Sequence, residues 1–192
     1  MCANSAERNP ACRSFAPEVD AKTEILVLGS MPGRESLRRR EYYGFPRNLF
    51  WSIAGELFGF DPALPYRERV AALLANGVGL WDVLAACERP ASSLDAAIAA
   101  PVPNDIPELL GRFPQIRRIC CNGSAAANYL AKFFPEIGAE VRRLPSTSPA
   151  AAMFSREEKL RAWHDALLLP APRTGKRPLL APRTEGQTET GR

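Results

Sequence analysis

The sequence predicts an α/β fold in which a parallel sheet is covered by helices on both faces. Short strand-like runs alternate along the chain with segments whose apolar residues recur at helical spacing. Such alternation indicates parallel strands, because each parallel connection needs a crossover, usually a helix. The chain has 192 residues, 46% of them hydrophobic, which is enough to bury one substantial core, so we expect one domain.

Four segments are predicted as strands, at residues 24–29, 78–83, 116–121 and about 140–144. The first three are mainly apolar, as is typical of strands buried on both faces. Trp81 and Asp82 lie near the carboxyl end of the second strand. In an open parallel sheet, the ligand crevice forms outside the carboxyl ends of the strands.

Five helices are predicted, at residues 46–58, 65–76, 106–113, 124–134 and 154–169. Pro46 is a typical first-turn residue for the first helix. Asn76-Gly77 is a capping signal at the end of the second, and Asn104-Asp105 caps the start of the third.

The chain is expected to divide into three parts. Residues 1–21 lack periodicity and are predicted to form a flexible arm, and residues 22–169 form the domain. Residues 170–192 are rich in Pro, Arg, Thr and Gly and are predicted to be a disordered basic tail. Most of the formal net charge of +4 falls in this tail, so bulk charge does not indicate strong non-specific DNA binding.

The five cysteines favour reduced thiols. None forms a C-x-x-C pair and their number is odd, which argues against a zinc site, an iron–sulfur site or a disulfide framework. No metal site is therefore predicted. Because no apolar run reaches the length of a membrane span and no signal peptide precedes the domain, we expect a cytoplasmic protein of bacterial type.

Two loops about a hundred residues apart carry the candidate site. The first begins with Gly-Ser-Met-Pro-Gly at 29–33 and continues to Tyr-Tyr-Gly-Phe-Pro-Arg-Asn-Leu-Phe-Trp at 42–51. The second is Leu-Pro-Ser-Thr-Ser-Pro-Ala at 144–150. Each follows a predicted strand, so both lie at the expected crevice. Their glycines, prolines and small hydroxyls suit a close approach to nucleic acid or phosphate.

Several common chemistries are disfavoured. The first loop lacks the spacing of a dinucleotide-binding loop and the Lys-Ser/Thr of a P-loop. His164 is the chain's single histidine and lies inside the last predicted helix, so neither a Ser-His-Asp nor a Cys-His set can be assembled. An enzyme built on this site would use neutral polar groups, backbone dipoles and an ordered water.

These motifs, with Leu-Trp-Asp-Val at 80–83 and Cys-Asn-Gly at 121–123, resemble the uracil-DNA glycosylase superfamily. Within it the chain is most similar to the hypoxanthine-DNA glycosylases, over residues 24–168. The resemblance implies a three-layer α/β/α sandwich with a four-stranded parallel sheet, and no cofactor. It also implies a monomer that binds double-stranded DNA containing a damaged base.

The resemblance implies excision of a flipped base by hydrolysis of its N-glycosidic bond. Hypoxanthine, from deoxyinosine, is the favoured substrate. The alternatives are uracil, mismatched thymine or 5-hydroxymethyluracil, or a catalytically silent DNA-binding member. Most relatives carry catalytic polar residues where this chain has Met31 and Leu144, and neither side chain can polarise water. That departure matches the hypoxanthine branch.

The same resemblance assigns the site residues. Asn48 is the catalytic candidate, although its place before a helix suits a backbone cap equally well. Tyr43 aligns with the aromatic residue that stacks on the base, and Phe45 stands where relatives often have His. The base-binding wall is completed by Gly29, Ser30, Met31 and Gly33. The DNA-binding candidates are Arg47, Asn122, Pro145, Ser146, Thr147 and Ser148. For residues 145–148 the alternative is a rigid turn between a strand and a helix. For Asn122 the alternative is a turn at the end of a strand.

Overall fold

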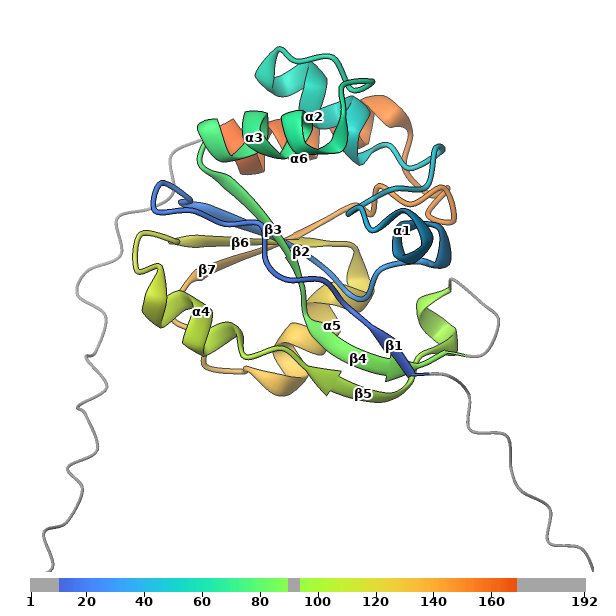
Figure 1. Cartoon of the computed structure of the whole chain (residues 1–192), viewed down its shortest axis with the longest axis vertical. Coiled ribbons are helices and arrows are strands. Elements are labelled where there is room, and N and C mark those ends of the chain that lie inside the picture. The colour runs from blue at the N-terminus through green and yellow to red at the C-terminus, as the bar shows by residue number, and fades with distance from the viewer. Residues whose placement is uncertain (1–10, 90–93, 169–192) are drawn as a thin grey trace, which may run out of the picture.

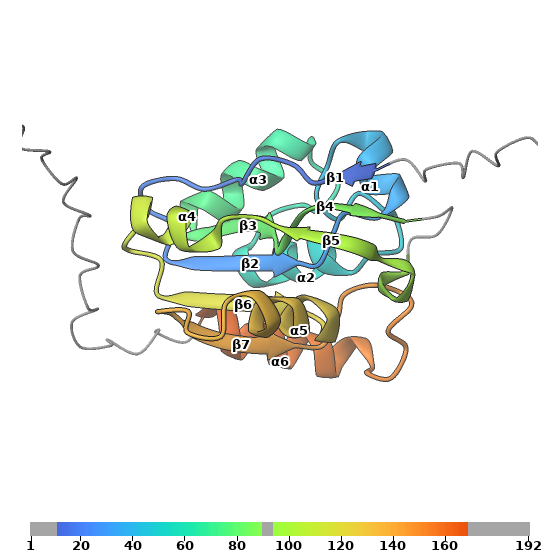
Figure 2. The same ribbon diagram turned by 90° about the horizontal axis from the view of Figure 1, so that it is seen from below.

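The computed structural model describes residues 11–89 and 94–168, and its centre is a four-stranded parallel sheet (Figure 1). The strand order is β3-β2-β6-β7, which Figure 2 shows along the sheet. The strands are β2 (Ile25–Gly29), β3 (Val78–Asp82), β6 (Arg118–Asn122) and β7 (Glu140–Leu144). All three neighbouring pairs are parallel, which confirms the predicted sheet.

Helices cover both faces of the sheet. Figure 1 shows α2, α3 and α6 on one face and α4 and α5 on the other. Their bounds are α2 (Phe50–Phe58), α3 (Tyr66–Ala75), α4 (Ile106–Arg112), α5 (Ser124–Phe133) and α6 (Arg156–Leu168). The α/β/α sandwich is therefore confirmed, and Asp105 caps α4 by accepting the Glu108 N–H at 2.9 Å, as its position predicted.

The start of α2 differs from the prediction. The helix begins at Phe50, four residues after Pro46. Residues 45–48 form a turn instead, in which the Asn48 N–H donates to the Phe45 carbonyl at 2.8 Å. The Asn48 side chain then accepts the Phe50 N–H at 3.0 Å. This side-chain hydrogen bond competes with helix formation and delays the first helical turn.

A second, antiparallel sheet was not predicted. It joins β1 (Ala11–Arg13), β4 (Leu84–Glu88) and β5 (Ala99–Pro103) in the order β1-β4-β5. Short, alanine-rich strands with two prolines in β5 give no clear alternation, and the β4–β5 register shifts twice. A 3₁₀ helix, η1 (Asp95–Ala97), lies between β4 and β5, and a short helix, α1 (Arg34–Arg39), interrupts the first candidate loop.

The described part of the N-terminal segment packs against the domain, which corrects the flexible arm expected through residue 21. Besides the β1–β4 pairing, Glu18 forms a two-bond bridge with Leu80 of β3, each N–H donating at 2.9 Å. The Tyr42 hydroxyl donates to the Ala16 carbonyl at 3.2 Å. Residues 1–10 and the predicted tail at 170–192 lie outside the described residues.

One buried ion pair joins the sheet to α6. Arg118 is 1% exposed, and its Nε donates to Glu140 at 2.8 Å across the β6–β7 pair. Its Nη1 donates to the Ala166 carbonyl in α6 at 2.7 Å. A buried guanidinium costs desolvation free energy that these partners must offset.

Replacing Glu140 should therefore destabilise the fold. We expect Glu140→Ala to lower the free energy of unfolding by about 2 kcal/mol, less than for a fully buried pair because Glu140 is partly exposed and Ala166 remains a partner. Urea denaturation would measure this, with the exposed Glu136→Ala as control. Equal stability of the two variants would contradict the expected role of the ion pair.

Candidate active site

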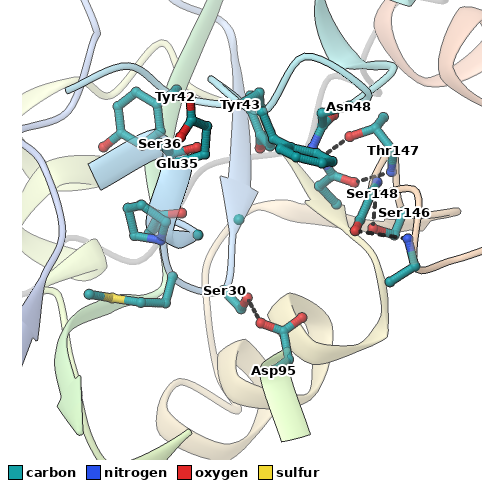
Figure 3. Close-up of a pocket in the computed structure, with 18 of the residues that line it drawn as sticks. Ser30, Glu35, Ser36, Tyr42, Tyr43, Asn48, Asp95, Ser146, Thr147 and Ser148 are labelled. Carbon is teal, nitrogen blue, oxygen red and sulfur yellow. Dashed lines mark hydrogen bonds between the residues drawn. The ribbon is translucent and has the colours of Figure 1, made fainter. Parts of the chain in front are cut away.

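A cavity of about 330 Å³ lies at the carboxyl ends of the four parallel strands. Gly29, Asp82 and Asn122 line it from the ends of β2, β3 and β6. The loop after β7 closes it with Ser146, Thr147 and Ser148 (Figure 3). Ten of the predicted site residues line this cavity: Gly29, Ser30, Met31, Gly33, Tyr43, Asn48, Asn122, Ser146, Thr147 and Ser148. The two candidate loops therefore meet where the topology places them.

Thr147 connects the two loops. Its carbonyl accepts the Leu49 N–H at 3.0 Å, which joins the second loop to the first. Its side chain and backbone form a reciprocal pair with Asn122: the Asn122 Nδ2 donates to Thr147 Oγ1, and the Thr147 N–H donates to Asn122 Oδ1, both at 2.9 Å. Because Thr147 is buried and both hydrogen bonds are partly shielded from solvent, the loop is fixed to the end of β6.

Gly123 allows this approach. Its φ of 95° lies in the left-handed region, and a Cβ there would sit 2.8 Å from the Ser146 Cβ. The Ser146 hydroxyl in turn accepts the Ser148 N–H at 3.2 Å, and the Trp163 Nε1 donates to the Pro145 carbonyl at 3.0 Å. The loop is thus a rigid turn between β7 and α6, as one of the two predicted interpretations held.

Tyr43 is held in a strained backbone conformation at the cavity wall. Its φ is 55°, which is rare for a bulky residue and is found mostly where surrounding structure enforces it. Its ring stacks on Phe50 with centroids 4.1 Å apart. Its buried hydroxyl has no hydrogen-bond partner among the described residues, and burial raises its pKa. Burial therefore keeps the hydroxyl protonated and away from the cavity surface.

Asn48 caps the backbone at the start of α2 and also lies at the cavity. Its Oδ1 accepts the Phe50 N–H, which is the backbone cap, and its side chain also lines the cavity beside Tyr43 (Figure 3). Because a backbone N–H can only donate, the amide oxygen must face Phe50. The orientation of the amide is thereby fixed, and Nδ2 remains as a donor.

Asp82 is a buried carboxyl group at the cavity that was not among the predicted site residues. It is 3% exposed, and its Oδ2 accepts a hydrogen bond from the Ser14 hydroxyl at 2.6 Å. Burial raises its pKa to about 7, although the Ser14 hydrogen bond and the Arg89 charge oppose the shift. Its Oδ1 occupies the space where a Cβ on residue 29 would lie, so only glycine fits at that strand end.

Ser30 and Asp95 meet on another side of the cavity, with the Ser30 hydroxyl 2.5 Å from Asp95 Oδ1 (Figure 3). Both residues line it. Asp95 also lies 3.9 Å from the buried guanidinium of Arg89, whose Nη1 donates to the Pro32 carbonyl at 3.3 Å. The loop after β2 and the β4–β5 connection are therefore coupled through polar groups.

Helix α1 forms part of the cavity rim. Glu35 lines the cavity, and its carboxylate accepts hydrogen bonds from Arg38 and Arg39 at 2.6 Å. Those hydrogen bonds lower the pKa of Glu35 to about 2. The Ser36 hydroxyl accepts the Gly44 N–H at 3.0 Å, which links α1 to the loop carrying Tyr43.

Two of the predicted DNA-binding residues do not line the cavity. Arg47 is exposed, with its guanidinium 5.3 Å from the ring centre of Phe45, itself a lining residue. Pro145 contributes its carbonyl to Trp163 instead. Thr147 does line the cavity but is 0% exposed, so its hydroxyl serves the contact with Asn122.

Three of the polar residues that sequence reasoning missed come from outside the two loops, whereas Glu35 and Ser36 lie within the first, on α1. Ser14 lies in the segment expected to be loose, and Asp95 lies in a connection that showed no pattern. Asp82 had a usable signal, since a carboxyl group at the end of an apolar strand points to the crevice. Ser14 and Asp95 carried no such signal.

The described residues contain neither a metal-binding cluster nor a membrane-spanning helix. Within residues 11–89 and 94–168, no group of three or more His, Cys, Asp or Glu could hold a metal ion. Cys12, Cys87, Cys120 and Cys121 are free thiols. No helix among the described residues combines the length and the apolar character needed to cross a membrane.

Comparison with known proteins identifies the family. Residues 16–168 match the family model described as the uracil DNA glycosylase superfamily. The chain belongs to the uracil-DNA glycosylase superfamily. The match spans both site loops and the whole parallel sheet, so the resemblance seen in the motifs is confirmed.

Named relatives within the superfamily come from two archaea. The chain is 38% identical over 148 residues to a hypoxanthine DNA glycosylase of Methanosarcina acetivorans, covering 77% of this chain and 92% of the relative. It is 34% identical over 155 residues to a hypoxanthine DNA glycosylase of Methanosarcina barkeri, covering 80% and 96%. These relatives give no support to the expectation of a bacterial type.

A solved superfamily structure has the same fold. The solution NMR structure of a candidate uracil DNA glycosylase from Methanosarcina acetivorans superposes with a TM-score of 0.73 at 35% identity. The likeness covers 82% of this chain and 97% of that one. The superfamily fold thus accounts for nearly all of the described domain.

The raised pKa of Asp82 predicts how stability depends on pH. In the unfolded chain this carboxyl group should titrate near 4, so between about pH 4 and 7 the folded state binds a proton that the unfolded state lacks. The free energy of unfolding should therefore fall as pH rises through that window, by roughly 2–4 kcal/mol more than in Asp82→Asn. Urea denaturation at pH 4–8 measures this, and parallel profiles would contradict it.

Proposed function

We propose that this chain is a hypoxanthine DNA glycosylase, which hydrolyses the N-glycosidic bond of deoxyinosine in double-stranded DNA during base-excision repair. The observation that carries the proposal is the Asn48 amide, whose oxygen is held by Phe50 so that its Nδ2 donor is offered to the cavity. Two relatives named hypoxanthine DNA glycosylase, at 38% and 34% identity, support hypoxanthine as the substrate.

Hydrolysis begins with the damaged nucleotide flipped out of the duplex into the cavity. Tyr43 offers a ring that Phe50 already supports from the core, so little ordering entropy is lost when a base stacks on it. Met31 adds an apolar wall. The fixed side chains then hold the base while the sugar remains connected to the DNA backbone.

The chemical step moves negative charge onto the base. The bond between C1′ and N9 breaks, its electron pair goes to hypoxanthine, the oxygen of a water molecule bonds to C1′, and a proton from that water is released. Donors that face the leaving base stabilise the transition state because they need no reorganisation. Asn48 Nδ2 is the uncharged donor placed to do this.

Asp82 suits the role of a neutral acid near the leaving base. An ionised carboxylate would repel the developing negative charge, whereas a protonated one can donate to it. Burial raises the pKa of Asp82 to about 7, so a substantial fraction is neutral at physiological pH. Because Ser14 donates to Oδ2, the proton is best accommodated on Oδ1.

The nucleophile is water, so the enzyme is monofunctional. None of the described residues that line the cavity is a lysine, which a Schiff-base lyase would need. The Lys159 ammonium is buried and donates to the Ala151 carbonyl at 2.8 Å. We expect the enzyme to act as a monomer on chromosomal DNA in the cytoplasm.

The rim supplies contacts to the DNA backbone. The hydroxyls and backbone amides of Ser146 and Ser148 lie on a rigid loop at the cavity, and Arg47 is exposed beside Phe45 at its edge. Such groups contact phosphates and fix the register without reading sequence. Asn122 and Pro145 hold this loop in place through Thr147 and Trp163.

Single-turnover excision tests the function and the role of Asn48. Wild type should release hypoxanthine from a deoxyinosine duplex, and Asn48→Asp should reduce the rate by roughly 10²–10³-fold. The aspartate keeps the oxygen that accepts from Phe50, so stability should change little, whereas Asn48→Ala loses both functions. Asn76→Asp, at the exposed end of α3, is the matched control.

Duplexes containing uracil or 5-hydroxymethyluracil belong in the same experiment. Faster release of either base than of hypoxanthine would reject the proposed substrate. Retained DNA binding without release of any base would identify a silent member of the superfamily. A normal rate in Asn48→Asp would reject the donor role of Asn48.

The proposed acid role of Asp82 predicts the pH dependence of excision. The single-turnover rate of wild type should fall as pH rises through about 7, because the donor is lost when Asp82 ionises. Asp82→Asn keeps an amide donor that does not titrate, so its profile should lack that step. A wild-type rate that stays level or increases across pH 6–8.5 would exclude this role.

A further inference from the structure

The hydrogen bond between Ser30 and Asp95 has a fixed direction. The Ser30 side chain lines the cavity from the end of β2, and its hydroxyl lies 2.5 Å from Asp95 Oδ1. A carboxylate accepts hydrogen bonds and cannot donate one, so the single proton of the hydroxyl must point to Asp95. Ser30 therefore offers the cavity only oxygen lone pairs.

Asp95 is held in this role by a buried cation. The Arg89 side chain is 1% exposed and its Nη2 lies 3.9 Å from Asp95 Oδ1. Its Nε and Nη2 have no hydrogen-bond partner among the described residues, so its charge depends strongly on the carboxylate nearby. Oδ1 of Asp95 therefore lies between the Ser30 hydroxyl and the Arg89 charge.

The Asn48 amide at the same cavity has the opposite character. Its Nδ2 is a donor without a partner among the described residues. In deoxyinosine the base carries one conventional donor, N1–H, and several acceptors, O6, N7 and N3. The acceptor-only Ser30 hydroxyl matches the single donor of that base, and Asn48 Nδ2 matches one of its acceptors.

We propose that Asp95 is a positioning residue that makes Ser30 a fixed acceptor, which selects bases with a ring N–H over bases whose ring nitrogen carries a lone pair. The inference rests on the proposed function and adds to it the rule by which a deaminated base is distinguished from its parent. Asp95 acts through Ser30 and does not itself need to touch the base.

Deamination changes the hydrogen-bonding character of the ring nitrogen N1, which is the atom that Ser30 is proposed to contact. Adenine has a lone pair at N1 beside an amino donor, and deamination gives hypoxanthine, with N1–H beside a carbonyl. The same change converts cytosine to uracil. With adenine in the position of hypoxanthine, two lone pairs would face one another, and an unsatisfied buried acceptor costs affinity. Ser30 would therefore exclude the abundant normal purine.

The test measures binding rather than cleavage, on two duplexes that differ at one base. One carries 2′-fluoro-arabino-inosine and the other 2′-fluoro-arabino-adenosine, because a 2′-fluorine destabilises positive charge on the sugar and prevents excision. The readout is the ratio of the two affinities, which cancels any loss of folded protein. Wild type, Asp95→Asn, Ser30→Ala and the double variant are compared, with Asp61→Asn, on an exposed turn, as the matched control.

Each single variant should lower the preference for inosine over adenosine by about tenfold. In Asp95→Asn the amide can donate to Ser30, which frees the hydroxyl proton to point into the cavity. In the Ser30→Ala background, Asp95→Asn should cause no further change in the ratio, because Asp95 acts only through that hydroxyl. The control should match wild type.

Three results would overturn the inference: an unchanged ratio in Asp95→Asn, an unchanged ratio in Ser30→Ala, or a further loss in the double variant. Equal weakening of both duplexes would mean that Asp95 only supports the structure. The outcome is separable from the proposed function. A wild type that prefers inosine yet releases no hypoxanthine from ordinary deoxyinosine would reject the glycosylase and leave the selection rule standing.

Discussion

The site depends on the two hydrogen bonds between Asn122 and Thr147. Asn122 is at the end of a central strand, and its amide satisfies both the hydroxyl and the backbone N–H of Thr147. The carbonyl of Thr147 then accepts the N–H of Leu49, next to Asn48. Both loops are therefore anchored to the end of one strand. This fixes the positions of the Tyr43 ring, the Asn48 amide and the loop at 146–148 relative to one another.

Three carboxyl groups line the cavity, and the negative charge of each is reduced or paired in a different way. Asp82 is kept partly neutral by burial, Asp95 faces the buried Arg89, and Glu35 accepts hydrogen bonds from two arginines of α1. These devices limit the free negative charge that an approaching phosphate backbone meets. Local pairing therefore accounts for how an acidic interior can coexist with a nucleic-acid substrate.

Periodicity and strand-end position were enough to predict the parallel sheet, its covering helices and the meeting of the two loops. They failed where structure depends on contacts distant in sequence. The β1-β4-β5 sheet has short, proline-containing strands without alternation, and Ser14 reaches Asp82 only because β1 pairs with β4. The role of Asn48 could not be decided from sequence, because its side-chain amide suits both a backbone cap and a site residue. In the structure its amide oxygen caps the backbone and its side chain lines the cavity.

The antiparallel sheet has a consequence for how this site can change over evolutionary time. Ser14 and Asp95 both come from this sheet and its connections, and each adjusts a group that the parallel sheet presents, Asp82 in one case and Ser30 in the other. On the proposed roles, substitutions there would alter the acidity of Asp82 or the base preference set at Ser30, and would leave Asn48 and Tyr43 in place. One part of the chain can therefore change the pH dependence and the substrate range, while another part keeps the amide donor and the stacking ring.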